Sequence, residues 1–286
     1  MSKATLVRTV SHVRELVAGW RGTHQTVALV PTMGNLHEGH LSLARLAREH
    51  ADRVVLSIYV NPTQFGAGED FAAYPRTLEE DRALIDEDGL VDAIFVPDDP
   101  EIYPFGADQA VRIALSELGS ELCGQRRPGH FDGVATVVCR LLNIVAPDTV
   151  VFGRKDYQQL LIIERVVADL RLPVKVISGP TIRHEDGLAI SSRNRYLNAG
   201  QRKAAPALYA ALGGIEKALK DGSRDYGAMQ QVAVDALRAS GFEPDYIEVR
   251  RAADLARPQA GDRPDELIVL AAAWLGKARL IDNLKI

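Results

Sequence analysis

The sequence predicts an α/β protein with a parallel-sheet domain over residues 1–180 and a smaller α+β domain over residues 181–286. In the first part, short runs of branched apolar residues alternate with segments of helical periodicity, which is typical of parallel strands buried on both faces. In the second part, three short apolar runs follow one another too closely for crossover helices and so indicate antiparallel strands. A polar loop after Pro180 separates the two patterns and sets the expected domain boundary.

The first domain is expected to alternate helices and strands in chain order. A helix over residues 10–18 precedes a strand over 27–30, and Pro31 and Gly34 end that strand in a turn. Leucine and alanine residues at helical spacing then predict a helix that runs to about His50. The further expected elements are strands over 54–60, 93–96, 111–115, 149–152 and 173–177, helices over 78–88 and 134–144, a helix carrying Leu160, Leu161, Ile163 and Val167, and a loop over 97–105.

The second domain is expected to contain two helices and three strands. Residues 199–220 and 226–240 have helical patterns, and Asp221-Gly222-Ser223 separates them. The three expected strands cover residues 246–249, 267–272 and 278–281.

The composition excludes several classes of protein. With 47% hydrophobic and 25% charged residues among 286, the chain has the make-up of a folded globular protein. A net charge of −4 with scattered basic residues argues against a nucleic-acid partner. No apolar stretch approaches the about 18 to 20 residues that span a bilayer, so we expect no membrane partner.

The cysteines indicate a reducing compartment. Cys123 and Cys139 are the two cysteines of the sequence, and they form no CxxC pair or Cys-His cluster, so we expect free thiols rather than a structural zinc site. Because no stretch resembling a signal peptide precedes them, we expect a cytoplasmic protein.

The stretch VALVPTMGNLHEGHLSL at residues 27–43 reads as a strand, a turn and a helix. His37 and His40 lie three residues apart where that helix begins, so both imidazoles can address one polyphosphate at the positive end of the helix dipole. A zinc-protease site is excluded because it needs histidines four apart with glutamate beside the first. The alternative is that both are ordinary capping or surface histidines.

Three later segments carry polar residues at loop positions. Asn-Pro explains a turn at residues 61–65, but it does not explain Gln64 or Phe65. After the strand over 149–152, Gly153 lets the backbone approach a ligand, Lys155 supplies a positive charge, and Asp156 can accept from ribose hydroxyls; a capping aspartate beside a surface lysine is the alternative.

The third of these segments contains Ser191, Ser192 and Arg193, whose two hydroxyls and guanidinium can bind pyrophosphate; an ordinary surface tripeptide is the alternative. Arg127 and His130 are expected to be solvated loop residues outside the site.

Six segments in order resemble the pantothenate synthetase (pantoate–beta-alanine ligase) family, within the HxGH nucleotidylyltransferase superfamily. They are PTMGNLHEGH at 31–40, NPTQF at 61–65, YPRT at 74–77, RPGHFDGVATVV at 127–138, GRKDYQQL at 153–160 and ISSRN at 190–194. Two positions depart from the family's usual wording, since Arg154 replaces a glutamate and Ile190 replaces a methionine.

The resemblance implies a Rossmann-like nucleotide-binding domain whose active site is covered by the smaller domain, and a homodimer. It implies ATP-dependent condensation of (R)-pantoate with beta-alanine through a pantoyl adenylate, with Mg²⁺. The implied catalytic residues are His37, His40, Lys155 and Arg193. The implied ATP-binding residues are Met33, Gly34, Asn35, Leu36, His37, Glu38, Gly39, His40, Gly153, Arg154, Lys155, Asp156, Ile182, Ile190, Ser191, Ser192 and Arg193. Asn61, Gln64 and Gln159 are implied for pantoate or beta-alanine, and no residue is assigned to the metal.

The residues agree with this chemistry. A carboxylate that attacks the α-phosphate of ATP needs no general base, which suits a site made of histidine, lysine, arginine and serine. The amides of Gln64 and Gln159 are expected to face each other across the pantoate site.

Three other functions stay open from the sequence. They are a cytidylyl- or adenylyltransferase of the same superfamily, an aminoacyl-tRNA synthetase fragment, and a nucleotide sensor without turnover. Later motifs argue against the first, and net charge and the absence of an anticodon-binding extension argue against the second. Which residues ligate Mg²⁺, the geometry of the oligomer, and the roles of Arg127, His130 and Arg154 also stay open.

Overall fold

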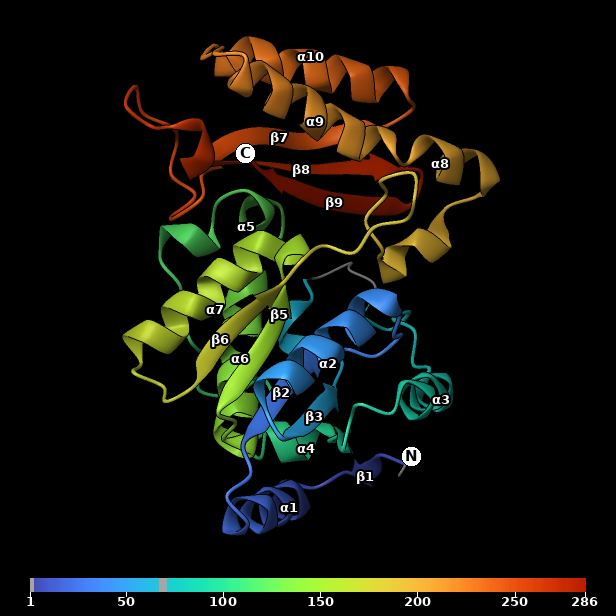
Figure 1. The fold of residues 1–286 in the computed structure, drawn as a ribbon, viewed down its shortest axis with the longest axis vertical. Helices are drawn as coiled ribbons and strands as arrows, with labels where there is room; N and C mark the ends of the chain where they lie inside the picture. Colours follow the sequence, from blue (N-terminus) through green and yellow to red (C-terminus); the bar gives the residue numbers. More distant parts are fainter. Residues whose placement is uncertain (1–2, 67–70) are drawn as a thin grey trace. The chain divides into compact units, whose positions relative to one another are not determined.

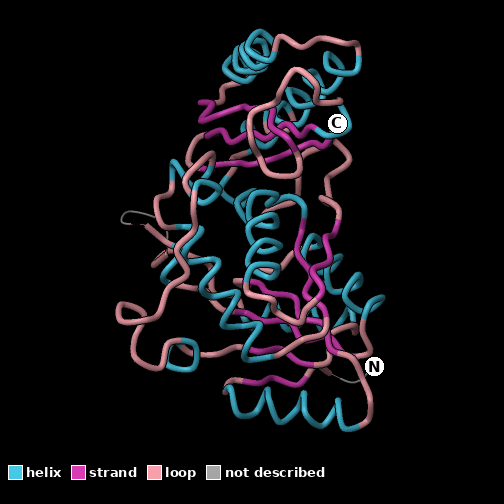
Figure 2. Tube along the Cα trace, turned by 90° about the vertical axis from the view of Figure 1, so that its left-hand side faces the viewer, coloured by secondary structure: helices cyan, strands magenta, loops and turns pink. Residues whose placement is uncertain are grey.

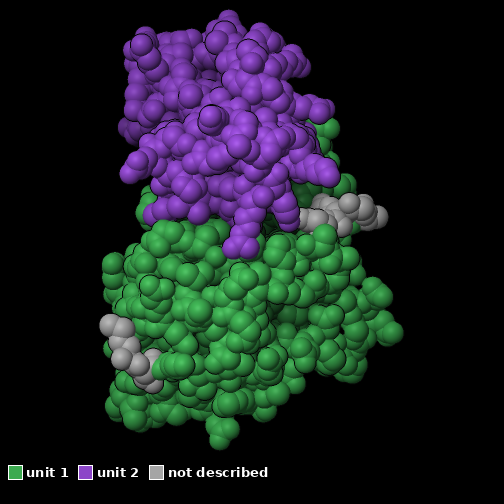
Figure 3. All heavy atoms as spheres, turned by 90° about the vertical axis from the view of Figure 1, so that its right-hand side faces the viewer, with its two compact units in different colours: residues 1–154, 159–180 green, residues 155–158, 181–286 purple. Residues whose placement is uncertain are grey.

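The computed structural model describes residues 3–66 and 71–286 (Figure 1). The chain forms two compact units, the first with residues 1–154 and 159–180 and the second with residues 155–158 and 181–286 (Figure 3). Residues 155–158 follow a strand of the first unit in the chain but are grouped with the second.

The first unit is built on a parallel sheet. Its order is β1-β4-β3-β2-β5-β6, so chain order reverses between β2 and β5. In open sheets of this kind ligands bind outside the carboxyl ends of the strands at such a reversal. The strands are β1 (Thr5–Val7), β2 (Val27–Thr32), β3 (Arg53–Ile58), β4 (Ala93–Phe95), β5 (Thr149–Gly153) and β6 (Lys175–Gly179). The helices are α1 (Val10–Gly22), α2 (Glu38–His50), α3 (Leu78–Asp88), α4 (Asp99–Ile102), α5 (Cys123–Arg126), α6 (His130–Val145) and α7 (Tyr157–Asp169), with short 3-10 turns η1 (Pro62–Gln64), η2 (Glu117–Gly119) and η3 (Arg154–Asp156).

Both faces of this sheet are covered by helices (Figure 2). Val27 and Leu29 pack in one apolar cluster with residues of α1, α6 and α7, whereas Ala28 and Val30 pack in another with residues of α2 and α3. Successive side chains of a strand point to opposite faces, so a continuous apolar run is what a doubly covered strand requires. The predicted parallel-sheet fold is confirmed.

Several predicted boundaries differ from the structure. The expected N-terminal helix continues to Gly22, and the strand expected over 54–60 ends at Ile58. The strand expected over 173–177 is β6, two residues later, and the loop expected over 97–105 contains α4. α3 begins and ends where the sequence predicted.

The strand predicted over residues 111–115 is wrong. This segment forms no strand, because its backbone bonds to side chains of α6 instead of to a neighbouring strand. The N–H of Ile113 donates to Thr136 Oγ1 at 2.9 Å, and that of Leu115 donates to Asp132 Oδ1 at 3.0 Å. Conversely, β1 was not predicted; it is a three-residue strand that pairs in parallel with β4.

The second unit is a small α+β unit, as predicted. β7 (Glu243–Arg251), β8 (Leu267–Leu275) and β9 (Ala278–Lys285) form an antiparallel sheet in that order. α9 (Ala207–Lys220) and α10 (Tyr226–Ala239) pack on it through one apolar cluster. The single helix expected over 199–220 is split into α8 (Ala199–Ala204) and α9, because Pro206 has no N–H to continue the helical bonding. η4 (Ser192–Tyr196) and η5 (Pro264–Glu266) complete the unit.

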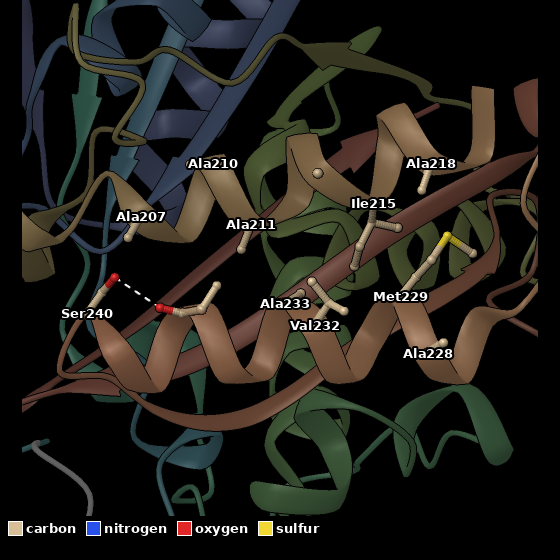
Figure 4. A pocket seen from close by; sticks show the side chains of 12 residues that line it. Ala207, Ala210, Ala211, Ile215, Ala218, Ala228, Met229, Val232, Ala233 and Ser240 are labelled. Atoms are coloured by element: carbon tan, nitrogen blue, oxygen red, sulfur yellow. Dashed lines mark hydrogen bonds between the residues drawn. The ribbon is translucent and has the colours of Figure 1, made fainter. Parts of the chain in front are cut away.

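Small apolar side chains of α9 and α10 line a pocket of about 500 Å³ (Figure 4). Ala211, Gly214 and Val232 are among its lining residues, and the hydroxyl of Ser240 at its end donates to the carbonyl of Ala236 at 3.0 Å. The pocket contains no residue that the sequence assigned to the site. Across residues 3–66 and 71–286, no helix has the length and hydropathy to cross a membrane.

Candidate active site

A buried carboxylate holds the turn between β2 and α2. Asp81 of α3, which is 1% exposed, accepts hydrogen bonds from the backbone N–H groups of Asn35 (3.0 Å) and Leu36 (2.7 Å). Gly34 has φ +79°, and a Cβ there would meet Asp81 Oδ2 and Ile58 Cγ2 at 3.0 Å. Glycine is therefore required in this turn both for its backbone conformation and for the approach of Asp81.

The side chain of Asn35 marks unfilled bonding capacity in the same turn. It is 2% exposed, and neither its amide oxygen nor its amide nitrogen has a hydrogen-bond partner among the described residues. Buried amides in native proteins are normally bonded to protein, ordered water or a ligand. This favours the predicted ligand contact for Asn35.

The two signature histidines stack on each other where α2 begins. The ring centroids of His37 and His40 are 4.1 Å apart with an interplanar angle of 25°. A Cβ at Gly39 would meet His37 Cε1 and Nδ1 at 3.0 Å, so glycine between the histidines leaves room for the ring to fold back. The stack places both imidazoles on one side of the start of α2, and their contact with a polyphosphate stays a prediction. The carboxylate of Glu38 turns to Arg45 of the same helix in an ion pair.

Asn61 and Gln64 form one network at the end of β3. Asn61 Nδ2 donates to Gln64 Oε1 (3.1 Å) and to the backbone carbonyl of Gly133 (3.2 Å). Its Oδ1 accepts from the hydroxyl of Tyr103 (2.7 Å) and that of Thr63 (3.0 Å). Since a carbonyl only accepts, the Asn61 amide has one orientation, and Gln64 must present its oxygen to it.

The orientation of the Gln64 amide follows from that contact. Gln64 Nε2 points to the sulfur of Met33 at 3.2 Å, and the residue is 8% exposed. Asn61 is 1% exposed, and both of its donor hydrogens are used within the protein. The predicted contact of Asn61 with substrate therefore has less support in the geometry than a role behind Gln64.

The expectation of a solvated loop residue is wrong for His130, whereas Arg127 lies in the turn between α5 and α6 and is half-buried. His130 is the first residue of α6 and is 8% exposed, with Nδ1 at 2.8 Å from the backbone carbonyl of Gln64. Its Nε2 lies 2.8 Å from Arg127 Nη1. A Cβ at Gly133 would lie 2.3 Å from the carbonyl oxygen of Thr63, so glycine lets α6 pack directly on the backbone of η1. The helix begins four residues before the predicted start, and its first turn makes these contacts with the backbone of η1.

The ends of three strands line a pocket of about 560 Å³ in the first unit. The segments after β2, β3 and β4 contribute Met33, Tyr59 and Val96, respectively. Arg76 and Asp81 supply polar lining. It lies beyond the carboxyl ends of these three strands and not at the reversal between β2 and β5, and no proposed catalytic residue is among its lining residues.

The segment after β5 carries a lysine and an aspartate, as predicted. Lys155 Nζ lies 3.7 Å from Asp156 Oδ2, and the lysine side chain is 18% exposed. Arg154, whose role the sequence left open, donates from Nε to Ser178 Oγ of β6 at 3.0 Å. Gln159 is half-buried on α7, and its approach to Gln64 stays a prediction.

In the second unit, residues 181–190 form a turn closed by an isolated antiparallel bridge between Arg183 and Ala189. The N–H of Ile190 donates to the carbonyl of Ile182 at 2.9 Å, so these two predicted ATP-binding residues are neighbours. The Ser191 hydroxyl accepts from the N–H of Arg193 at 3.3 Å and caps η4. Ser192 and Arg193 are half-buried.

The sequence reasoning missed Asp81 and set His130 aside. Asp81 lies in an acid-rich first turn of α3, where no local signal distinguishes it from Glu79 and Glu80. Its importance comes from contacts to a turn more than 40 residues earlier in the chain.

Comparisons with known proteins match the whole chain. A family model described as pantoate-beta-alanine ligase matches residues 5–285. A pantothenate synthetase from Thioalkalivibrio sulfidiphilus is 54% identical over 279 residues, which cover 96% of each chain. One from Alkalilimnicola ehrlichii is 52% identical over 280 residues, covering 98% of this chain and 97% of the relative.

Solved structures agree with these relatives. A pantothenate synthetase from Thermus thermophilus has a TM-score of 0.90 with 44% identity, covering 98% of this chain and 99% of the other. A pantoate-beta-alanine ligase from Francisella tularensis, solved with beta-gamma ATP and beta-alanine, has a TM-score of 0.82 with 32% identity, covering 99% and 97%. The chain therefore belongs to the pantoate–beta-alanine ligase family.

Proposed function

We propose that this protein condenses (R)-pantoate with beta-alanine at the expense of ATP, giving pantothenate, AMP and pyrophosphate. The observation that carries the proposal is the family match over residues 5–285, together with the stacked histidines at the start of α2. The proposed ATP-binding and catalytic residues are those that the sequence predicted.

In the first step a carboxylate oxygen of pantoate attacks the α-phosphorus of ATP, and the bond to pyrophosphate breaks. Pantoyl adenylate and pyrophosphate result, and no proton has to be removed from the attacking carboxylate. Negative charge grows on the phosphate oxygens, and the proposed donors to it are His37, His40, Lys155 and Arg193. Groups that are already in place for such charge lower the barrier because they need no reorganisation.

In the second step the amine of beta-alanine attacks the pantoyl carbonyl, and AMP leaves as the amide forms. The attacking nitrogen loses a proton in this step. Water must be kept from the acyl adenylate, since hydrolysis would return pantoate and waste ATP.

Gln64 is the proposed contact to pantoate. Its Nε2 faces away from Asn61, so it can donate to a carboxylate or hydroxyl oxygen. We also propose Gln159 for this substrate. Asn61 supports Gln64 through the bond described above.

Magnesium is proposed as a companion of ATP rather than as a resident ion. Within residues 3–66 and 71–286 no group of three or more His, Cys, Asp and Glu side chains could hold a metal ion. Mg²⁺ keeps several waters and is commonly bound through substrate phosphates and one or two carboxylates, so this donor set fits an ion that arrives with the polyphosphate. When bound, it offsets phosphate charge.

Two further proposals concern the setting of the enzyme. Neither Cys123 nor Cys139 takes part in a disulfide among the described residues, which supports a reducing cytoplasmic compartment. A homodimer is proposed from the family resemblance.

One assay tests the proposed function. Purified protein is incubated with ATP, Mg²⁺, pantoate and beta-alanine, and AMP and pantothenate are followed. We expect equal amounts of both, and none when pantoate is left out. A nucleotidylyltransferase would retain the nucleotide in its product, and a sensor would bind ATP without forming AMP, so either outcome would overturn the proposal.

A further inference from the structure

The last strand of the chain carries two buried polar residues side by side. Asp282 is 4% exposed and Asn283 is 8% exposed, and both lie on β9. A buried carboxylate or amide destabilises a protein unless it is bonded. The partners of these two residues therefore indicate what the strand holds in place.

Asp282 holds the bridged turn of residues 181–190. Arg183 donates to it from both terminal nitrogens, with Nη1–Oδ2 at 2.6 Å and Nη2–Oδ1 at 2.8 Å. The guanidinium also lies 3.8 Å from the ring centroid of Tyr209 and donates to the carbonyl of Gly187 at 3.0 Å. A two-bond ion pair with a stacked ring restricts Arg183 to one geometry.

The same turn contains Ile182 and Ile190. Arg183 follows Ile182 directly and pairs with Ala189 in an isolated bridge, and Ile190 donates to the carbonyl of Ile182 at 2.9 Å. The ion pair thus fixes the backbone of both proposed ATP-binding residues to β9.

Asn283 holds the second proposed ATP segment. Its Nδ2 donates to the backbone carbonyl of Lys155 at 2.8 Å. Its own N–H donates to Asp282 Oδ1 at 2.8 Å, which joins the two neighbours into one network. Both segments therefore bond to adjacent residues of a single strand within the second unit.

We propose that Asp282 and Asn283 are positioning residues for ATP: they fix the backbone of Lys155 and of the Ile182–Ile190 pair in one register. In this proposal both side chains act through these protein contacts and not through contact with ATP. The proposal rests on the proposed roles of Lys155, Ile182 and Ile190, and it goes beyond them by assigning the last strand a part in ATP use. If the role of these residues were purely structural, changing them would lower only the stability of the protein.

The sheet offers a matched control. Asp245 of β7 and Arg279 of β9 form a similar pair, with distances of 2.7 Å and 3.0 Å and side chains 9% and 12% exposed. Neither belongs to the segments assigned to ATP. Asp245→Asn weakens the sheet in a comparable way without changing the bonds to Lys155 or Arg183.

The experiment compares Asn283→Leu, Asp282→Asn and Asp245→Asn with the wild type. Thermal unfolding and steady-state constants for ATP, pantoate and beta-alanine are measured for each. We expect Asn283→Leu and Asp282→Asn to lower kcat/KM for ATP by roughly 10- to 100-fold, because small misplacements of a charged group reduce rates on that scale. The KM for pantoate should change less than twofold, and Asp245→Asn should keep wild-type constants.

A further variant breaks the geometry of the same ion pair in case Asp282→Asn fails to fold. Arg183→Lys keeps the charge and loses the two-bond geometry and the stacking, so it should show the same selective effect on ATP in milder form. Equal increases in the KM for ATP and the KM for pantoate, or normal constants in folded Asn283→Leu protein, would overturn the positioning role. Absence of turnover in the wild type would instead overturn the proposed function, so the two failures are distinguishable.

Discussion

Nδ1 of His130 lies 2.8 Å from the backbone carbonyl oxygen of Gln64, so α6 holds the residue that is proposed to contact pantoate. The carbonyl only accepts, so Nδ1 carries the proton. Arg127 only donates, so Nε2 is the acceptor of its bond. The two bonds require the neutral Nδ1–H tautomer and leave His130 no freedom to turn.

His130→Ala is expected to lower kcat/KM for pantoate by about tenfold, the worth of one well-formed hydrogen bond, with a smaller effect on ATP. His130→Asn can place an amide donor near the Nδ1 position and should recover part of the loss. His12→Ala, at an exposed position of α1, is the control. Steady-state constants decide the matter, and equal effects on both substrates would contradict the anchoring role.

Gln64→Ala should weaken the use of pantoate far more than ATP binding. A site that bonds a substrate hydroxyl rejects an analogue without it by up to roughly 10⁴- to 10⁵-fold, because its own polar groups are then unpaired. The variant should therefore also reduce the preference for pantoate over a deoxy analogue. If Gln64 only holds its loop, constants for both substrates would worsen together with no change in preference.

Asn61→Asp tests the orientation of the Gln64 amide. The aspartate would place an oxygen against Gln64 Oε1 and the carbonyl of Gly133, where Asn61 now donates. Leaving these acceptors unpaired should destabilise the protein by about 1 to 3 kcal/mol and reduce pantoate use. Unfolding in denaturant gives the first quantity, and wild-type pantoate constants would show that the amide orientation has no functional role.

His40→Ala should leave the fold intact and slow adenylation by about 10²- to 10³-fold, the usual effect of removing one preorganised donor to developing charge. The measurement is single-turnover formation of pantoyl adenylate, with circular dichroism as the check on folding. A near-normal rate would remove His40 from the catalytic residues.

Asp81→Asn should both destabilise the protein and slow adenylation. An asparagine would direct an amide N–H toward one of the two backbone donors that Asp81 now accepts, so the turn before His37 would shift. Asp92→Asn is the control, because Asp92 accepts from the N–H of Val54 at 2.8 Å at the amino end of β3, opposite the site. We expect both variants to lose a comparable amount of stability. Only Asp81→Asn should also lose adenylation.

Pyrophosphate should form from ATP and pantoate without beta-alanine, up to about one equivalent per site. This follows if the α-phosphate, rather than the γ-phosphate, lies at the amino-terminal end of α2, where backbone N–H groups favour an anion. Release of orthophosphate and ADP would point to an acyl phosphate instead. Rapid-quench analysis of both anions distinguishes the two outcomes.

The sequence by itself determined the fold class, most elements and the family. Buried strands such as β2 and β5 were predictable because apolar runs report burial on both faces, and α3 was predictable because Gly89 ends it with a left-handed residue. The signature around His37 and His40 was visible because its residues are neighbours in the chain.

The tertiary structure alone decided which polar residues act together. Asp81 is hydrogen-bonded to Asn35, His130 to Gln64, and Asn283 to Lys155, at sequence separations of 46, 66 and 128 residues. β1 exists only through its pairing with β4, and residues 111–115 form no strand because side chains of α6 take their backbone bonds. Periodicity and turn signals describe a residue's local surroundings, whereas a buried hydrogen bond is decided by whichever partner the folded chain brings within reach.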